Sequence, residues 1–290
     1  MSTGRSHRIL MAGLPAVGKT TFLAALWYFV QQTNFPSRLR FKRLERDSQY
    51  LNQIKDTWLE CNPVARTPVG TEKIVNMILT KEATGEDLTL FFPDLSGESF
   101  SHQWIDREYS TAYGDFLKGA CGGVVFIHPD QMKKPIRIDT AMSVAGGIPT
   151  TAENQAPAAT EPPAPVKDWS PIETPTQVQN IELLQFIMAS DRPHGPFRLA
   201  VIVSAWDRVA ALKKSPAEWL SSQFPMLDQF LRSNDDEFET NVYGVSAQGG
   251  DYEKEGSKLG KLRPGERVQI VGPDIQKEHD ITEPLAWLIQ

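Results

Sequence analysis

The sequence has few cysteines, and this scarcity excludes one class of protein. Cys61 and Cys121 are the only two in 290 residues, and neither has a His or another Cys at the spacing of a metal site. Two cysteines cannot build the disulfide framework that holds small secreted domains together. We therefore expect a reduced, cytoplasmic protein whose fold depends on a hydrophobic core.

Long apolar runs are also missing. No stretch approaches the roughly 18 to 20 apolar residues that span a bilayer, and residues 1–8 lack the apolar core of a signal peptide. Ser2 stands where myristoylation needs a glycine, and the last four residues carry no cysteine for prenylation. We expect no direct membrane insertion.

An excess of positive charge is the third absence. The formal net charge is -6, whereas proteins that bind nucleic acid gather Lys and Arg on one face to neutralise phosphates. The basic residues between 38 and 46 are offset by Glu45 and Asp47, so we interpret them as a solvated segment. We expect no direct binding of nucleic acid.

Short apolar runs alternate with stretches of helical length. The runs predict strands over residues 8–12, 73–80, 87–92, 122–128, 198–204 and 241–246. The stretches between them predict helices over residues 19–30, 44–61, 100–118, 177–190, 216–232 and 279–290. This alternation is typical of a three-layer α/β fold with a mostly parallel sheet covered on both faces.

Residues 131–176 differ in composition from the rest of the chain. They are rich in Pro, Ala, Thr and Gly and too poor in apolar residues to bury a core. We expect a disordered or weakly ordered insertion within a single domain that spans residues 1–290. Both a tolerated surface loop and a partner-binding segment remain open for it.

The strongest motif is G-x-x-x-x-G-K-T (Walker A) over residues 13–20, between a predicted strand and a predicted helix. Its glycines let the backbone N–H groups surround a phosphate at the helix N-terminus. Lys19 would bridge the β- and γ-phosphates, and the Thr20 hydroxyl would ligate Mg²⁺. The predicted phosphate-binding residues are Gly13, Pro15, Ala16, Val17, Gly18, Lys19, Thr20 and Thr21.

A second motif, D-x-x-G, ends the apolar strand predicted over residues 87–92. Asp94 can reach the magnesium through water, and the Gly97 N–H can meet the γ-phosphate. Alone this pattern is usually a turn. Its position about 80 residues after the P-loop, at the end of an apolar strand, favours a function.

With these two motifs in order, the chain resembles the Ras-like P-loop GTPases of the TRAFAC class. The loop GLPAVGKTTFLAALW, the segment DLSGE and the terminal EPLAWLIQ make it most similar to the double-GTPase family of bacterial conflict and signalling systems. The resemblance implies a single elaborated G domain that binds GTP or GDP with Mg²⁺. It also implies a molecular switch that works with a protein effector or activator.

Two further segments resemble the motifs by which this family recognises the guanine base. Asp207 matches the Asp of N/T-K-x-D, which accepts hydrogen bonds from guanine, whereas Ser204 and Ala205 replace the Asn and Lys. The loss of the lysine stem implies weaker affinity or looser specificity. The loop that closes over the base in the family corresponds to Ser246, Ala247 and Gln248.

The resemblance is least complete for catalysis. The threonine that senses the γ-phosphate and ligates Mg²⁺ would be Thr67 or Thr71, of which we prefer Thr67. Glu98 stands where many relatives carry a water-orienting Gln, and its carboxylate would repel the γ-phosphate. We therefore expect slow hydrolysis of GTP to GDP and phosphate, with Lys19, Thr67, Gly97 and Glu98 as the catalytic set.

Two other functions remain open at this point. An ATP-dependent enzyme, either an ATPase or a kinase, would need an arginine-rich second site, and the arginines here are dispersed. A scaffold that holds nucleotide without turnover would account for Glu98 and Ala205. Arg66 and Arg107 could assist hydrolysis, although surface positions are the simpler interpretation, and we treat His102, His128 and His194 as structural or solvent-facing.

Overall fold

The structure is a computed structural model that describes residues 5–35, 37–44, 48–64, 73–94, 97–109, 111–135, 170–192, 195–273 and 275–290. Within these ranges one nine-stranded sheet has the order β2-β3-β4-β1-β5-β6-β7-β8-β9. The strands are β1 (Arg5–Ala12), β2 (Leu39–Leu44), β3 (Lys73–Lys81), β4 (Asp87–Asp94), β5 (Ala120–Ile127), β6 (Phe197–Ser204), β7 (Phe238–Ser246), β8 (Gln269–Gly272) and β9 (Ile275–Glu278). The central pairs β4-β1, β1-β5, β5-β6 and β6-β7 are parallel, so the predicted mostly parallel sheet is confirmed.

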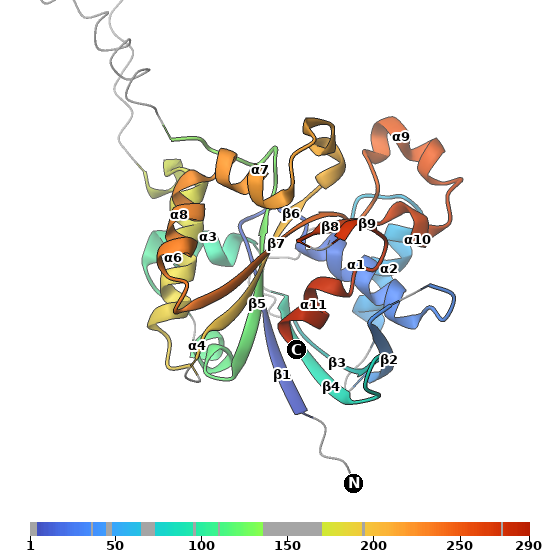
Figure 1. The fold of residues 1–290 in the computed structure, drawn as a ribbon, viewed down its shortest axis with the longest axis horizontal. Coiled ribbons are helices and arrows are strands. Elements are labelled where there is room, and N and C mark those ends of the chain that lie inside the picture. The colour runs from blue at the N-terminus through green and yellow to red at the C-terminus, as the bar shows by residue number, and fades with distance from the viewer. Residues whose placement is uncertain are drawn as a thin grey trace, which may run out of the picture.

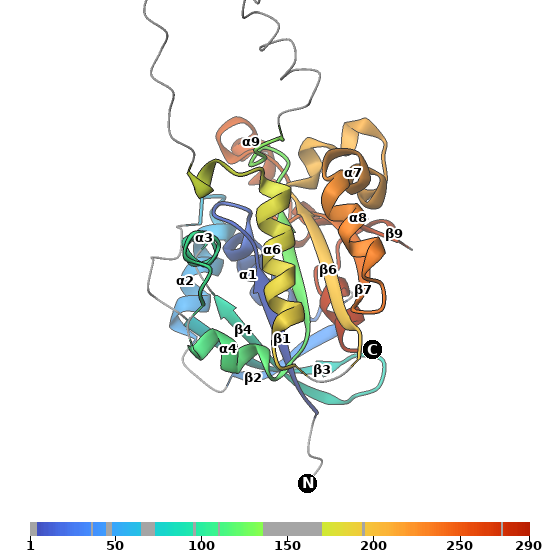
Figure 2. The same cartoon turned by 90° about the vertical axis from the view of Figure 1, so that its left-hand side faces the viewer.

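Helices cover both faces of the sheet, because alternate residues of each central strand point to opposite sides. Ile9 and Met11 belong to the core beneath one set of helices, whereas Leu10 and Ala12 belong to the core beneath the other. Figures 1 and 2 show the two helical layers on either side of the sheet. The first layer holds α1 (Lys19–Gln31), α2 (Gln49–Leu59) and α11 (Glu283–Leu288). The second holds α3 (Gly97–Asp106), α4 (Thr111–Leu117), α6 (Thr176–Ala189), α7 (Pro216–Gln223) and α8 (Pro225–Ser233).

The predicted helix over residues 44–61 is wrong at its start. Residues 39–44 form β2, which pairs antiparallel with β3 at the sheet edge, and the helix begins at Gln49. In this strand Leu39 is buried while Lys42 and Arg43 are exposed. The charged residues therefore masked a strand whose apolar residues Leu39, Phe41 and Leu44 pack in or against the core.

Two other predicted helices are each divided in two. The helix predicted over 216–232 breaks between α7 and α8 at Pro225, which has no N–H to continue the first helix. The helix predicted over 100–118 breaks between α3 and α4, where Arg107 has φ 58. The strands β8 and β9 and the short helices α9 (Tyr252–Leu259) and α10 (Pro264–Arg267) were not predicted.

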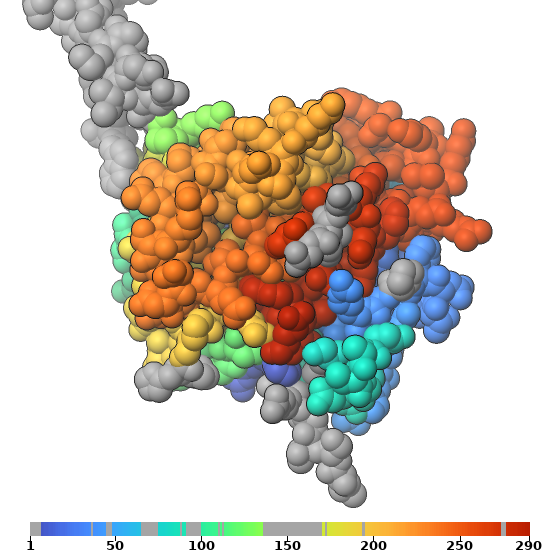
Figure 3. Space-filling view, in the orientation of Figure 1, coloured from blue at the N-terminus to red at the C-terminus, as the bar shows by residue number. Residues whose placement is uncertain are grey.

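The C-terminal segment closes the first layer. Thr282 accepts hydrogen bonds from the Arg38 N–H (3.1 Å) and the Leu39 N–H (3.3 Å), and Arg198 donates to the carbonyl of Gln290 (2.7 Å). In the space-filling view the red C-terminal residues lie between the orange α7–α8 region and the blue and teal N-terminal residues (Figure 3). None of the helices in the described ranges combines the length and apolar character needed to cross a membrane.

The two ends of the predicted insertion meet. The Thr176 N–H donates to the Lys133 carbonyl (3.0 Å), and the Lys133 N–H donates to the Thr176 hydroxyl (2.8 Å). Thr176 also begins α6. Residues 136–169 lie outside the described ranges, so their disorder stays a prediction.

Candidate functional site

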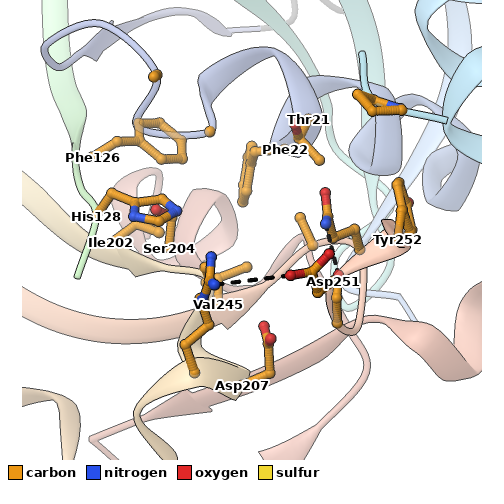
Figure 4. Close-up of a pocket in the computed structure, with 18 of the residues that line it drawn as sticks. Thr21, Phe22, Phe126, His128, Ile202, Ser204, Asp207, Val245, Asp251 and Tyr252 are labelled. Atoms are coloured by element: carbon orange, nitrogen blue, oxygen red, sulfur yellow. Dashed lines mark hydrogen bonds and ion pairs between the residues drawn. The ribbon is translucent and has the colours of Figure 1, made fainter. Parts of the chain in front are cut away.

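A cavity of about 380 Å³ opens at the carboxyl ends of the parallel strands. Its walls come from the loop after β1 and from the residues that follow β5, β6 and β7, as Figure 4 shows. In open parallel α/β sheets this edge is where ligands bind, because the loops that leave the strands converge there. The topology therefore brings the predicted site segments to one place.

The loop after β1 is shaped by backbone that favours glycine. Gly13 has φ 148, Ala16 has φ 60 and Gly18 has φ 89. A Cβ on Gly13 would lie 2.9 Å from the carbonyl oxygen of Phe126, so glycine is required there. Gly18 precedes α1 and offers no side-chain cap, and the first turn of α1 carries no acidic residue. The N–H groups at this helix N-terminus are thus suited to an anion.

Lys19 lies within the arch of this loop. Its Nζ donates to the carbonyls of Gly13 (2.8 Å) and Leu14 (3.1 Å), and it lies 5.6 Å from the ring centroid of Phe100. The residue is only 7% exposed. These contacts hold the ammonium group beside the loop, where it could donate charge-assisted hydrogen bonds to a phosphate.

The D-x-x-G segment lies at the same sheet edge. Asp94 ends β4, the parallel neighbour of β1, and Gly97 and Glu98 begin α3. The side chains of Asp94 and Glu98 lie outside what the structure describes, as do Arg66, Thr67 and Thr71 entirely.

Arg107 does not extend toward the loop. It forms an ion pair with Glu182 of α6, and its guanidinium lies 4.1 Å from the ring centroid of Trp104. This agrees with the surface role preferred from the sequence.

The segment after β6 directs Asp207 into the cavity (Figure 4). Ala205, with φ 46, starts a 3-10 turn over Trp206–Arg208. Trp206 is buried against Gly244, where a Cβ would come within 2.3 Å of the indole. Gly244 is thus necessary for the turn that carries Asp207.

Four hydrogen bonds hold the segment after β7 in place. The Ser246 hydroxyl donates to Asp207 and accepts the N–H of Gly249 at 3.1 Å. The Ala247 carbonyl accepts the indole N–H of Trp58 at 2.9 Å, and the Gln248 amide donates to the Gly250 carbonyl at 2.7 Å. Ser246 is fully buried, so it supports the cavity wall from behind.

The predicted residues divide into two groups around the cavity. The loop side contributes Ala16, Gly18 and Thr21 to the wall, and the segments after β6 and β7 contribute Asp207, Ala247 and Gln248. The remaining predicted residues of the loop and of the first turn of α1 lie outside the wall: Gly13, Pro15, Val17, Lys19 and Thr20.

Sequence reasoning missed several residues that line the cavity. They are Pro63, His128, Arg208, Asp251 and Tyr252. His128, interpreted from the sequence as structural or solvent-facing, directly follows β5 and lines the cavity. Its position at a strand end was the signal that could have found it. Arg208 forms an ion pair with Asp130 (2.8 Å) and approaches Asp251 (3.9 Å). Such contacts between distant segments leave no local pattern.

A hydrogen bond from the backbone fixes the tautomer of the neutral His128 ring. Its Nδ1 accepts the N–H of Asp130 at 3.1 Å, so the proton of the neutral ring is on Nε2. Burial lowers the pKa of His128 below its ordinary value of about 6.5. The carboxylates of Asp130 and Asp207 oppose this shift, and the charge of Arg208 adds to it.

Comparisons with known proteins give one family. A search of curated proteins finds no match. Among solved structures, the bacterial selenocysteine-specific elongation factor EF-Sec is 12% identical with a TM-score of 0.36, and the match covers 87% of this chain and 28% of that one. The G domain of the T. maritima FeoB iron transporter is 14% identical with a TM-score of 0.33, covering 88% of this chain and 97% of that one. The profile of the Double-GTPase 1 family matches residues 10–288, which confirms the resemblance found in the motifs. The chain therefore belongs to the Double-GTPase 1 family of GTP-binding proteins.

Proposed function

We propose that this chain binds GTP and GDP in the cavity, together with Mg²⁺, and acts as a nucleotide-dependent switch with slow hydrolysis. One observation carries the proposal: a P-loop and a carboxylate that can read guanine, Asp207, open onto one cavity. A ligand that spans both would have phosphates at one end and a base with two hydrogen-bond donors at the other. GTP has this arrangement.

The loop side fits the phosphates. The backbone has positive φ at Gly13, Ala16 and Gly18, as a loop that wraps a phosphate requires, and Lys19 adds a buried positive charge. We propose that the lysine moves from its carbonyl partners to the β- and γ-phosphates when the nucleotide binds. The exchange keeps its ammonium hydrogen-bonded in both states.

The base side fits guanine through Asp207. Guanine presents N1–H and an exocyclic amine on one edge, and a carboxylate accepts both, whereas adenine offers no such pair. The Ser246 hydroxyl leaves Asp207 further acceptor capacity while fixing its orientation. This arrangement supports a preference for GTP over ATP.

The donor set also fits Mg²⁺. This ion prefers oxygen ligands and is usually bound by one or two protein groups together with phosphates. Thr20 lies in the first turn of α1, and Asp94 ends the strand next to β1. We propose that the Thr20 hydroxyl holds the ion, that Asp94 reaches it directly or through water, and that Thr67 completes the set; the ion would neutralise the phosphate charge.

Hydrolysis would transfer the γ-phosphoryl group to water, with GDP as the leaving group. Glu98 is the residue at the position that would orient the water, and its negative charge near the γ-phosphate supports a slow rate. Slow turnover suits a switch whose segments around Thr67 and Asp94 respond to the γ-phosphate. Exposed Ile105 and Tyr109, at the end of α3 and just after it, support a protein effector on this side, in a bacterial signalling or conflict system.

The test compares four nucleotides, one variant and one control variant. We would measure the affinity for GTP, GDP, ATP and xanthosine triphosphate with and without Mg²⁺, and follow phosphate release in single-turnover experiments. Xanthine carries a carbonyl in place of the exocyclic amine, so Asp207→Asn should move the preference from GTP to xanthosine triphosphate by about 100-fold. Asp228→Asn, a carboxylate of α8 that does not line the cavity, is the matched control.

Two outcomes would reject this assignment. Equal binding of GTP and ATP, with no effect of Asp207→Asn, would favour an ATP-dependent enzyme. Tight GTP binding without any phosphate release would favour a scaffold that holds nucleotide without turnover.

A further inference from the structure

His128 occupies a distinctive place among the residues of the cavity. It follows β5, whose Ile127 pairs with Val203 of β6, so the register sets His128 beside Ser204. Ser204 stands where related GTPases carry an Asn. Its hydroxyl donates to the Ile127 carbonyl (3.0 Å) and is therefore already engaged with the protein.

The ring of His128 faces the cavity with a donor. Since Nδ1 accepts the Asp130 N–H, the neutral ring carries its proton on Nε2. Figure 4 shows His128 and Asp207 on the walls of the same cavity. In the part of the chain that the structure describes, His128 makes no hydrogen bond through Nε2.

The other donor side chains of the cavity are engaged or badly placed. Arg208 is paired with Asp130, and the Gln248 amide donates to Gly250. The hydroxyl of Tyr252 is buried away from the open space. Thr21 lies on α1 at the loop end, where the phosphates would lie. His128 is thus a donor of the cavity wall that no group in the described ranges engages through Nε2.

A hydrogen-bond donor is needed on the edge of guanine that Asp207 would not contact. That edge presents the acceptors N7 and O6. We propose that His128 donates a hydrogen bond from Nε2 to N7 of the bound guanine and supplies, from the neighbouring strand, the base-positioning donor that Ser204 does not offer. This inference rests on the proposed guanine-nucleotide site and deepens it by naming a specificity-determining residue.

The same contact explains how a site without the lysine of related GTPases can still orient a base. The purine would be held at two edges, by Asp207 on one and by His128 on the other. Ala205, with φ 46, lines the same cavity and fills little of it, because its side chain is a single methyl group. Specificity would then depend on a pair of side chains from adjacent strand ends.

The experiment pairs a variant with a nucleotide analogue that lacks the acceptor. We would measure the affinity of the full chain for GTP and for 7-deaza-GTP, in which carbon replaces N7. The wild type should bind 7-deaza-GTP about 3- to 10-fold more weakly, the value of one hydrogen bond. His128→Phe, which keeps a ring but no donor, should weaken GTP binding by a similar factor and leave 7-deaza-GTP unchanged.

Two further variants separate this contact from a general effect on folding. His128→Gln carries an amide donor and should recover part of the discrimination between GTP and 7-deaza-GTP. His102→Phe, at an exposed position of α3 outside the cavity, should retain the wild-type ratio. A shared loss of affinity for both nucleotides in His128→Phe would indicate a packing defect and overturn the proposal.

The outcomes also distinguish this inference from the proposed function. If GTP binds and Asp207→Asn switches the preference to xanthosine triphosphate, the guanine site stands. A wild-type ratio near one, or an unchanged ratio in His128→Phe, would then reject the His128 contact alone. If neither GTP nor 7-deaza-GTP binds to the wild type, the guanine-nucleotide site itself is rejected.

Discussion

The two ends of the cavity are built in different ways. The proposed phosphate end is one continuous loop with positive φ at Gly13, Ala16 and Gly18, and its chemistry would come mainly from backbone N–H groups. The proposed base end is assembled from the residues after β5, β6 and β7, and its chemistry would come from side chains. Backbone recognition requires a fixed local sequence, whereas side-chain recognition can move to a neighbouring strand end. The phosphate end is therefore easy to find in a sequence, and the base end is not.

The largest effect should come from the phosphate end. Lys19→Ala removes a charge that would make two or more charge-assisted hydrogen bonds, each contributing about 1.5–3 kcal/mol. We expect at least a 100-fold loss of affinity for GTP, GDP and ATP alike, measured by titration calorimetry. Lys261→Ala, at an exposed lysine outside the cavity, is the control. An affinity within tenfold of wild type would show that the phosphates bind elsewhere.

A smaller effect, confined to the base, should come from Ser246. Its buried hydroxyl orients Asp207 and accepts the Gly249 N–H, so Ser246→Ala loosens the carboxylate and leaves one N–H unpaired. We expect GTP affinity to fall about tenfold while ATP affinity changes little. The test is to measure the affinity for GTP and for ATP on the same preparation. Equal losses would mean that the two ends are not independent.

The hydrogen bond between Trp58 and Ala247, in the segment after β7, should have a smaller effect on GTP affinity. Trp58→Phe keeps an aromatic ring near Arg267, whose guanidinium lies 4.6 Å from the indole centroid, but removes the hydrogen bond to Ala247. We expect about a threefold loss of GTP affinity and about 1 kcal/mol of stability, from one hydrogen bond. Trp219→Phe, in the other core, is matched for burial and should leave GTP affinity unchanged. The same threefold loss in both variants would refute a specific link.

The smallest effect should be a pH dependence of stability from His128. Its pKa is lowered in the folded state by burial, so below about pH 6.5 the unfolded chain binds a proton that the folded chain does not. Stability should therefore fall as the pH drops from about 6.5 toward the folded pKa. Thermal unfolding at pH 7.5 and 5.5 should show a smaller decrease in His128→Gln than in wild type. An identical decrease in both would assign the pH dependence to other groups.

The sequence predicts the parts of the fold that short-range patterns determine. Apolar runs located the parallel strands, because these are buried on both faces. The edge strand β2 was missed since its outer face is charged, and β8 and β9 are only four residues long each. The break at Pro225 could have been predicted, because proline cannot continue a helix, but the apolar periodicity runs through it.

The same limit applies to the candidate site: short-range patterns predict its continuous loop but not the side chains that distant segments contribute. The loop from Gly13 to Thr20 is readable because its eight adjacent residues form one continuous motif. His128 and Arg208 reach the cavity only because the strand order places β5, β6 and β7 side by side. Strand order depends on long-range packing that no window of the sequence contains. A check of the last residue of each predicted strand would have found His128.

The hydrogen bonds between Lys133 and Thr176 have a practical consequence for protein engineering. They join the chain just before residue 136 to the chain just after residue 169, so the anchor point is set by residues outside that interval. Replacing 136–169 with a short Gly/Ser linker should preserve the sheet, because loop closure depends only weakly on length. The same position is a natural place to insert a fluorescent reporter or an affinity tag.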